Sequence, residues 1–190
     1  MNIIGKFHNW RRKLRWNKQY RKGRWDNLKG EIETVRYQAI IDCMSKFGSK
    51  NPSILDLGCG EGILCQRLEP IGHSYFLGMD FSSVSIKNAA QLQLKNAEFV
   101  CADIHTFLPV KKFDIIVFNE VFYYIHETEK EKVLTRMIDS LNENGIIITS
   151  IYREGTGCWH YFDKKLNQIL FKTITTDSEK TYWKIGVYKK

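Results

Sequence analysis

The chain has 190 residues, of which 43% are hydrophobic and 26% charged, a composition typical of one soluble globular domain. We expect a cytoplasmic protein without metal, because the sequence has no apolar run that could cross a bilayer, no recognisable secretory signal and no Cys-x-x-Cys pair among its five cysteines. Membrane-spanning, secreted and disulfide-built proteins are thereby disfavoured.

The positive charge is concentrated near the N-terminus. The net charge is +8, but residues 1–30 alone hold ten Lys or Arg residues and one acid, so residues 31–190 are nearly neutral. We predict an N-terminal basic helical arm and cap over residues 1–48, followed by the main domain over residues 49–190. Any attraction to an anionic partner belongs to the arm.

Two helices are predicted in the arm and cap. Apolar residues recur among basic ones at helical spacing, which predicts a short amphipathic helix. These residues are Ile3, Phe7, Trp10 and Leu14. A second helical pattern runs from about Glu31 to Lys46, and turn-forming residues at 48–52 end this part of the chain.

From Ser53 onward, short apolar strands alternate with helical patterns. The predicted strands are Ile54–Leu57, Tyr75–Met79, Glu98–Ala102, Phe113–Asn119 and Ile146–Tyr152. The first predicted helix follows the glycines after the first strand and ends near Leu68. The second extends from an N-cap at Ser82 or Ser83 to about Lys95. The third extends from a capping box of Thr128 and Glu131 to about Leu141, and Asn144-Gly145 ends it. Apolar strands separated by helices indicate a parallel sheet covered on both faces.

The C-terminal part of the chain has a different pattern. A helical stretch is predicted near Cys158–Leu170, and the alternating segments Phe171–Thr176 and Tyr182–Tyr188 predict an antiparallel hairpin. The whole pattern predicts a doubly wound, Rossmann-like α/β fold. Its sheet would be mostly parallel and seven-stranded, with the antiparallel hairpin at the C-terminus.

Acidic residues and glycines collect where three successive strands end. The first strand is followed by Asp56, Gly58, Gly60 and Gly62. Asp80 ends the second strand, and Asp103 follows the third. Because doubly wound sheets bind ligands at the carboxyl ends of their strands, these positions predict a nucleoside ligand, with Asp80 on ribose hydroxyls and Asp103 on an adenine amino group.

The spacing disfavours a dinucleotide. A Gly-x-Gly-x-x-Gly motif that starts at Gly58 needs glycine where the sequence has Ile63, and there is no Gly-Lys-Ser/Thr motif for a phosphate loop. Asp56 would also repel a pyrophosphate, whereas it suits a cationic ligand. S-adenosylmethionine carries an ammonium and a sulfonium, which meet this requirement.

The sequence resembles class I S-adenosylmethionine-dependent methyltransferases. The resemblance covers about residues 50–152, and it is carried by Ile54–Gly62, Gly78–Ser82, Cys101–Asp103 and Phe113–Val121. A narrower resemblance to small methyltransferases of the nodulation-protein type, whose relatives occur in glycan and natural-product clusters, is carried by Trp25-Asp26, Glu33, Arg36-Tyr37, Asn119–Tyr124 and Tyr182–Ile185.

This resemblance implies S-adenosylmethionine as the cofactor and S-adenosylhomocysteine as its product. It implies that Asp56 and the glycines at 58, 60 and 62 contact the methionine part. Asp80 would bind the ribose, and Phe81 would lie against a face of the adenine.

Other residues of the cofactor site follow from the same resemblance. Asp103 and Ile104 would contact the adenine edge, and Asn119 would lie under the sulfonium at the end of the fourth strand. Tyr20 or Trp25 could close over the cofactor, although Trp25 equally fits a packing residue.

Catalytic candidates follow the fourth and fifth strands. Methyl transfer requires the acceptor atom in line with the methyl group, and a general base assists when the acceptor is a hydroxyl or a protonated amine. His126 is the preferred base by its ordinary pKa, and His160 is a second candidate. His126 equally fits an exposed residue just before a helix cap, and His160 fits a helix-surface residue beside a packing Trp159. Glu120 could neutralise a cationic acceptor, and Tyr124 could act as an acid–base group or form a pocket wall.

The acceptor is open among three classes. The small size of the chain and its aromatic residues favour a small molecule or a sugar or glycan, methylated on oxygen or nitrogen. The basic arm also admits RNA or another nucleic acid, although Asn119–Phe122 differs from the Asn/Asp-Pro-Pro-Tyr segment typical of enzymes that methylate base amino groups. Residues 1–22 fit peripheral contact with an anionic membrane as well.

Overall fold

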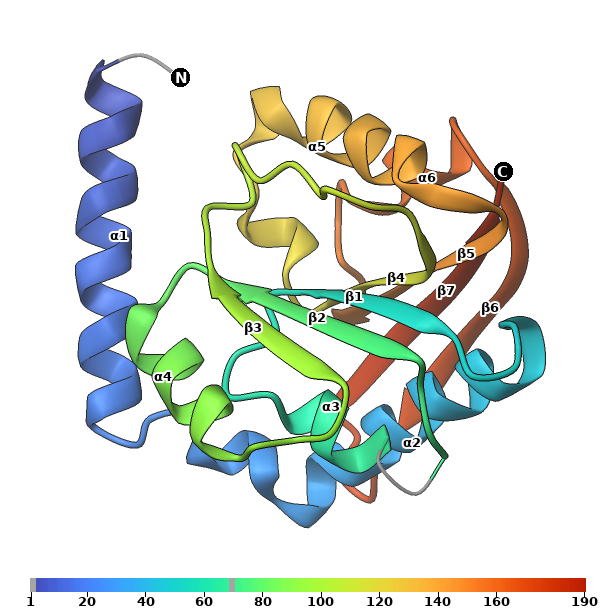
Figure 1. Ribbon diagram of the computed structural model, residues 1–190, viewed down its shortest axis with the longest axis horizontal. Helices are drawn as coiled ribbons and strands as arrows, with labels where there is room; N and C mark the ends of the chain where they lie inside the picture. Colours follow the sequence, from blue (N-terminus) through green and yellow to red (C-terminus); the bar gives the residue numbers. More distant parts are fainter. Residues whose placement is uncertain (1–2, 69–70) are drawn as a thin grey trace.

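A seven-stranded mixed sheet forms the centre of the molecule (Figure 1). The computed structural model describes residues 3–68 and 71–190, with side chains described from Trp10 onward. The strands are β1 (Ser53–Leu57), β2 (Tyr75–Asp80), β3 (Ala97–Cys101), β4 (Phe113–Asn119), β5 (Leu141–Tyr152), β6 (Asn167–Thr175) and β7 (Tyr182–Lys189).

The strand order is β3-β2-β1-β4-β5-β7-β6, and the order reverses between β1 and β4. Strands β1 to β5 are parallel, whereas β7 lies antiparallel between β5 and β6. The predicted Rossmann-like fold, mostly parallel with a C-terminal antiparallel hairpin, is confirmed. The reversal between β1 and β4 is the point where such sheets bind ligands.

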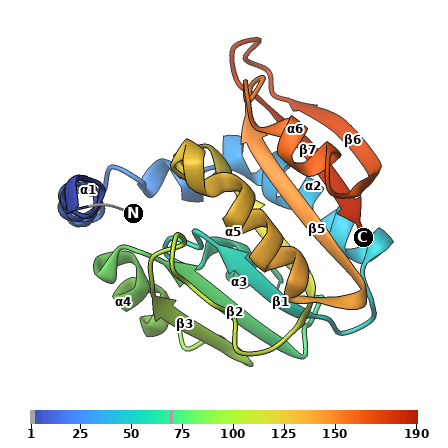
Figure 2. The same ribbon diagram turned by 90° about the horizontal axis from the view of Figure 1, so that it is seen from above.

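Helices cover both faces of the sheet (Figures 1 and 2). One face carries α2 (Glu31–Phe47), α3 (Ile63–Leu68) and α4 (Ser83–Gln91), and the other carries α5 (Glu127–Asp139) and α6 (Trp159–Asp163). Because side chains alternate along a strand, Ile115 and Val117 of β4 pack with α2 and α3, whereas Ile116 and Phe118 pack with α5 and α6. Both faces of β4 are therefore buried, as its apolar sequence predicts.

The helix α1 (Ile3–Arg21) lies outside these layers, at the edge of the molecule next to α4 (Figures 1 and 2). The buried Asn17 joins it to the start of α4. Ser82 Oγ donates to Asn17 Oδ1 at 2.7 Å, and Asn17 Nδ2 donates to Ser83 Oγ at 3.4 Å. A helix was predicted here, but α1 extends farther toward the C-terminus than the pattern of apolar residues indicated.

The predicted apolar side of α1 is not its packed side. The side chains of Ile3 and Phe7 lie outside the described residues, and those of Trp10 and Leu14 are 57% and 49% exposed. The helix instead packs against the rest of the fold with Trp16, Asn17 and Tyr20, which lie close together in the sequence. The sequence pattern failed because a polar residue and two aromatic ones make the contact.

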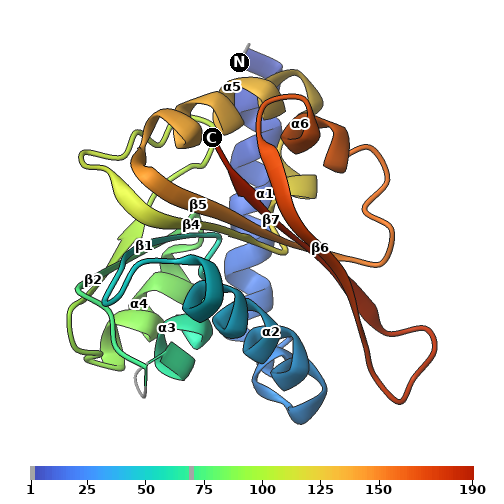
Figure 3. The same ribbon diagram turned by 90° about the vertical axis from the view of Figure 1, so that its right-hand side faces the viewer.

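The helix α2 is part of the central core. Its residues Tyr37, Ile40 and Met44 are buried in one apolar cluster with α3 and the sheet, and Figure 3 shows α2 beside the strands of the C-terminal hairpin. The division of the chain into residues 1–48 and 49–190 stays a prediction. Among the described residues, no helix is long and apolar enough to span a membrane.

Several predicted boundaries were wrong. The helix α5 begins at Glu127 with His126 as N-cap residue, so Thr128 is not a cap; its Oγ1 lies 2.9 Å from His126 Nδ1. The helix ends at Asp139, and Asn144-Gly145 lies inside β5, where a Cβ on Gly145 would be 3.1 Å from the carbonyl oxygen of Asp114. A register shift opposite this segment explains why glycine fits within the strand.

Two other predicted helices were too long. The helix α4 ends at Gln91 and not near Lys95, and the positive φ of Gln93 (50°) is incompatible with continuing it. The helix α6 has only five residues, because β6 already begins at Asn167 and pairs with β7. Residues 167–170, which the local pattern assigned to a helix, therefore belong to strand β6.

Candidate functional site

A cavity of about 280 Å³ opens at the carboxyl ends of β1, β2 and β4, beside the point where strand order reverses. Its walls come from α1, α2, the loops that follow β1 to β4, and the short helix η2 (Phe122–Tyr124). The predicted site residues in its lining are Tyr20, Trp25, Gly58, Gly60, Asp80, Phe81, Asp103, Ile104, Asn119, Glu120 and Tyr124. The structure thus brings together most of the predicted cofactor residues.

The glycine-rich turn after β1 brings backbone into the cavity. Gly58 and Cys59 both donate their N–H to the carbonyl of Met79, at 2.7 and 3.0 Å. Gly58 and Gly60 have φ values of +74° and +56°, which L-residues rarely adopt. Gly62 also has a positive φ but lies beside Phe99 and Ala89, outside the cavity lining.

Asp80 ties this turn to the end of β2. Its Oδ2 accepts the N–H of Gly60 at 3.1 Å, and its Oδ1 accepts the N–H of Ser82 at 2.7 Å. Burial raises the pKa of Asp80, while these backbone hydrogen bonds act in the opposite direction. Asp80 therefore shapes the glycine turn as well as presenting a carboxylate to the cavity.

Asp56 is a buried acid without a hydrogen-bond partner among the described residues. Both of its carboxylate oxygens are buried and unpaired, and it lies behind the residues that line the cavity. Burial and the neighbouring Asp80 raise its pKa well above the usual range, whereas Arg36 opposes this shift. An unpaired buried acid next to the glycine turn fits a cofactor that carries an ammonium and a sulfonium.

Asp103 is held at the opposite rim by a histidine that sequence analysis did not select. His105 Nε2 accepts the backbone N–H of His126 at 3.2 Å, so Nδ1 carries the proton and donates to Asp103 Oδ1 at 2.7 Å. The backbone N–H of His105 donates to the same oxygen at 3.0 Å. These contacts fix the position of Asp103 in the cavity lining.

Aromatic side chains close the cavity on the side of α1. The indoles of Trp16 and Trp25 are stacked, with centroids 4.7 Å apart and 7° between their planes. Trp16 also meets the edge of Tyr124 at 5.2 Å, and Arg12 donates to the carbonyl of Tyr124 at 2.8 Å. Tyr20 is buried so close to the glycine turn that a Cβ on Gly60 would be 2.9 Å from its hydroxyl.

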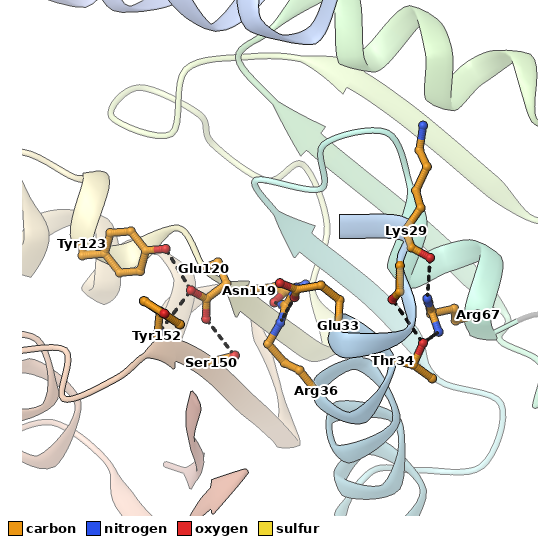
Figure 4. A network of polar contacts seen from close by, with 11 residues as sticks. Lys29, Glu33, Thr34, Arg36, Arg67, Asn119, Glu120, Tyr123, Ser150 and Tyr152 are labelled. Atoms are coloured by element: carbon orange, nitrogen blue, oxygen red, sulfur yellow. Dashed lines mark hydrogen bonds and ion pairs between the residues drawn. The ribbon is translucent and has the colours of Figure 1, made fainter. Parts of the chain in front are cut away.

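Glu120 lines the same cavity and is held by hydrogen bonds from three residues (Figure 4). Tyr123 donates its hydroxyl to Oε2 at 2.9 Å, Tyr152 donates its backbone N–H to Oε2 at 3.1 Å, and Ser150 donates its hydroxyl to Oε1 at 2.9 Å. Glu120 has a φ of +57°, a strained conformation for this residue type. Its pKa is raised by burial, an effect that Arg36 and these hydrogen bonds oppose.

Arg36 is a buried cation on the cavity-facing side of α2 (Figure 4). Its Nε and Nη2 donate to Glu33 Oε2 at 2.9 and 2.7 Å, and its Nη1 donates to Asn119 Oδ1. The guanidinium also lies 4.4 Å from the ring centroid of Tyr37. Arg36 therefore connects α2 to the end of β4, next to Glu120.

The structure does not bring His126 or His160 to the cavity. His126 is exposed at the start of α5, and His160 is exposed on α6 with its ring 4.1 Å from that of Tyr161. Neither lines the cavity, so the geometry does not support the predicted catalytic roles of these two residues. No group of three or more His, Cys, Asp or Glu side chains in the described residues is arranged to hold a metal ion.

Sequence analysis gave no role to several residues of the lining. Arg36 carried part of the resemblance. It is a lone basic residue on an otherwise apolar side of a helix, three residues after Glu33, and this pattern could have indicated a buried ion pair. His105 gave a signal too, since it comes two residues after Asp103. Trp183 also carried part of the resemblance, within Tyr182–Ile185, whereas Tyr152 on the neighbouring strand gave no local signal.

A cavity beside the point where strand order reverses is typical of Rossmann-like proteins that bind a nucleoside cofactor. Residues 48–186 match the family described as a methyltransferase domain. The chain belongs to this family and is a class I S-adenosylmethionine-dependent methyltransferase, with S-adenosylmethionine as its cofactor.

The chain is 32% identical over 153 residues to protein arginine N-methyltransferase 1 of Saccharomyces cerevisiae, a match that covers 74% of this chain and 42% of that protein. It is 30% identical over 105 residues to malonyl-[acyl-carrier protein] O-methyltransferase of Bacillus cereus, with 54% and 38% covered. The chain thus spans less than half the length of these two relatives.

The fold is similar to that of the N-methyltransferase NodS from Bradyrhizobium japonicum WM9. The TM-score is 0.74 with 18% identity, and the match covers 85% of this chain and 97% of that one. A structure of NodS with S-adenosyl-L-homocysteine gives a TM-score of 0.73 at 18% identity, with 86% and 90% covered. At this identity, the likeness concerns the fold, and it agrees with the nodulation-type resemblance of the sequence.

Gly58→Ala tests the glycine turn. We expect a loss of about 1–2 kcal/mol in stability from the left-handed backbone and, in addition, a lower affinity for S-adenosylhomocysteine. The second effect is expected because the new Cβ would lie 2.7 Å from Val121 Cγ2 and displace the cavity wall. Thermal unfolding and calorimetry measure the two effects.

Gly157→Ala is the matched control. Its φ is +77°, close to that of Gly58, but nothing lies within 4 Å of the added Cβ. It should lose similar stability and bind S-adenosylhomocysteine like the unmodified protein. Equal cofactor affinity in the two variants would contradict the assignment of the turn to the cofactor site.

Proposed function

We propose that the protein transfers the methyl group of S-adenosylmethionine to a nitrogen or oxygen atom of a small molecule or of a sugar, free or within a glycan. One observation carries the proposal: the same cavity extends from the glycine turn and Asp80 to the fixed carboxylate of Glu120. A cofactor at the turn and an acceptor at Glu120 would therefore share one cavity.

The residues at the strand ends suit the parts of the cofactor. Asp80 is placed for the ribose hydroxyls, Asp103 with Ile104 for the adenine edge, and Asp56 for the cationic amino-acid part. When bound, S-adenosylmethionine supplies an activated methyl group. Tyr20 and Trp25 would exclude water from the site, as their burial and stacking allow.

The acceptor side combines a carboxylate with aromatic walls. Among the described residues, Glu120 Oε1 accepts one hydrogen bond, from Ser150, so this oxygen has a further lone pair for an N–H or O–H of the acceptor. Tyr124 and Tyr152 line the same side and suit stacking on a sugar or heterocycle. Glu120 would orient the acceptor and take its proton, and proximity would supply much of the rate increase.

Asp80→Ala tests the cofactor site directly. We expect the affinity for S-adenosylhomocysteine to fall by about 1.5–3 kcal/mol, roughly 10–150-fold, because a charged hydrogen-bond acceptor is lost and Gly60 loses its partner. Calorimetry measures this change. The exposed Asp177 provides a control, since Asp177→Ala should bind like the unmodified protein. Unchanged affinity in Asp80→Ala would rule out this site for the cofactor.

An RNA acceptor is the second candidate, and the basic exposed side of α1 favours it. Acidic side chains in the cavity lining oppose it, because Glu33, Glu61, Asp80, Asp103 and Glu120 outnumber Arg12 and Arg36. Release of S-adenosylhomocysteine can be measured with amino sugars, hydroxyl-bearing sugars, small amines and structured RNA. Turnover with RNA alone would replace the small-molecule or sugar proposal.

A further inference from the structure

We propose that the outward side of α1 docks the protein on an anionic lipid bilayer. We call this side, together with Lys22 directly after the helix, the docking face; it consists of Trp10, Arg11, Leu14, Arg15, Lys18, Arg21 and Lys22. All seven side chains are exposed. The proposal concerns a surface that methyl transfer itself does not use.

The period of the helix separates the docking face from the packed side. At 3.6 residues per turn, the six residues of the docking face that belong to α1 fall within one half of the helix circumference. Trp16, Asn17 and Tyr20 fall in the other half and contact Trp25, Ser82 and the glycine turn. The docking face is thus directed away from the fold, and Figure 2 shows α1 end-on at the edge of the molecule.

The docking face is strongly and uniformly positive. The first acidic residue of the chain is Asp26, so α1 contains none. Among the described residues, no ion pair involves Arg15, Lys18, Arg21 or Lys22. These four cations have no ion-pair partner in the described part of the chain, and the helix that carries or directly precedes them has no acid, so they attract an extended anionic surface.

Two apolar side chains favour a lipid surface over a nucleic acid. Trp10 is 57% exposed and Leu14 is 49% exposed, and they lie one helical turn apart on the docking face, each followed in the sequence by an arginine, Arg11 and Arg15. An interfacial helix inserts such residues at the boundary between headgroups and acyl chains, with its Lys and Arg side chains at the phosphates. A phosphodiester backbone offers no comparable apolar layer for Leu14.

The position of α1 gives the docking a consequence for the active site. Arg12, Trp16 and Tyr20 on the inner side of the same helix line the cavity, so docking through the outer side places the bilayer about one helix diameter, roughly 10–12 Å, from this wall of the cavity. A membrane-borne acceptor would then be concentrated near the cavity. This consequence rests on the proposed function, whereas the docking itself does not.

Cosedimentation of the full chain with vesicles tests the docking. The vesicles are phosphatidylcholine alone or phosphatidylcholine with about 30% phosphatidylserine. We expect binding to the anionic vesicles, at least about tenfold weaker binding to neutral ones, and loss of binding at about 0.5 M salt, where screening is strong. No preference for the anionic vesicles would overturn the proposal.

A matched pair of triple variants assigns the binding to the docking face. In Arg15→Glu/Lys18→Glu/Lys22→Glu, we expect at least about tenfold weaker vesicle binding. Lys50→Glu/Lys112→Glu/Lys180→Glu changes the net charge equally at exposed positions outside α1 and should bind like the unmodified protein. Equal losses in both variants would show a general charge effect and overturn the assignment.

Three further measurements separate the role of the apolar pair, the state of the cofactor site and the choice between lipid and RNA. Trp10→Ala should weaken vesicle binding without changing the charge, and unchanged binding would overturn the role of the apolar pair. Affinity for S-adenosylhomocysteine, measured on each variant, reports an intact cofactor site, so a failure of the proposed function would be seen separately. Tighter binding to a single-stranded RNA than to anionic vesicles at equal salt would replace the bilayer with nucleic acid.

Discussion

Glu120→Gln is expected to lower the rate of methyl transfer by about 10²–10⁴-fold, the range typical for loss of a general base. Glutamine keeps the size of the side chain but loses the charge, and its amide cannot satisfy all three donors from Tyr123, Ser150 and Tyr152. Affinity for S-adenosylhomocysteine should change little, because Glu120 lies on the acceptor side of the cavity. Single-turnover assays with the acceptor found in the turnover screen measure the effect.

The pH dependence gives a second signature of Glu120. Burial raises the pKa of this carboxyl group above its usual range, although Arg36 opposes the shift. A base must be deprotonated to act, so the rate should rise as the pH increases through this raised pKa. The fall in rate at acidic pH, which is the acidic limb of the pH–rate profile, should be absent in Glu120→Gln.

A control separates the carboxylate from a general change of charge. Glu143 is exposed on β5, and Glu143→Gln should keep both the rate and the acidic limb. Full activity in Glu120→Gln would contradict the role of Glu120 and would direct attention to Tyr124, the other predicted catalytic residue in the cavity lining.

Arg36→Met is expected to lower the free energy of unfolding by about 3–5 kcal/mol, because removal of one partner leaves buried charge uncompensated. Glu33 would lose two hydrogen bonds, Asn119 would lose its donor, and Glu120 would lose the nearby cation that lowers its pKa. Urea unfolding measures the change. The methionine retains much of the apolar volume of the arginine stem.

Arg67 serves as the matched control for Arg36 (Figure 4). It is partly exposed, and it donates to Thr34 Oγ1 at 3.0 Å and to the carbonyl of Lys29 at 3.5 Å. Arg67→Met should therefore cost about 1 kcal/mol or less. Equal losses in the two variants would mean that the Arg36 network contributes no more than a surface contact. In that case, Arg36→Met/Glu33→Gln would also show no coupling between the two sites.

Local sequence determined which parts of the fold could be predicted. β4 was predicted with its observed bounds, because a strand buried on both faces carries a continuous apolar run, here residues 115–118. The glycine turn and Asp80 were placed correctly for a similar reason: their conformation and position depend on the chain within a few residues. Such constraints are visible in a single sequence.

Contacts between distant segments determined the parts that were missed. A general base was expected at His126 from its ordinary pKa, but the packing of the segment after β3 brings His105 to the cavity and leaves His126 outside. Arg36 and Asn119 are 83 residues apart in the chain, so no local pattern links them. The length of β5 depends likewise on its pairing with β4, which local propensity does not contain.

The opposite sides of α1 connect two binding events through one rigid element. Its inner side lines the cavity through Trp16 and Tyr20, and its outer side carries Arg15 and Lys18. If a lipid surface and the cofactor both favour the position of α1 seen here, each must increase the affinity for the other by the same factor. Cofactor occupancy would then regulate residence on the membrane, and release of S-adenosylhomocysteine would promote departure from it.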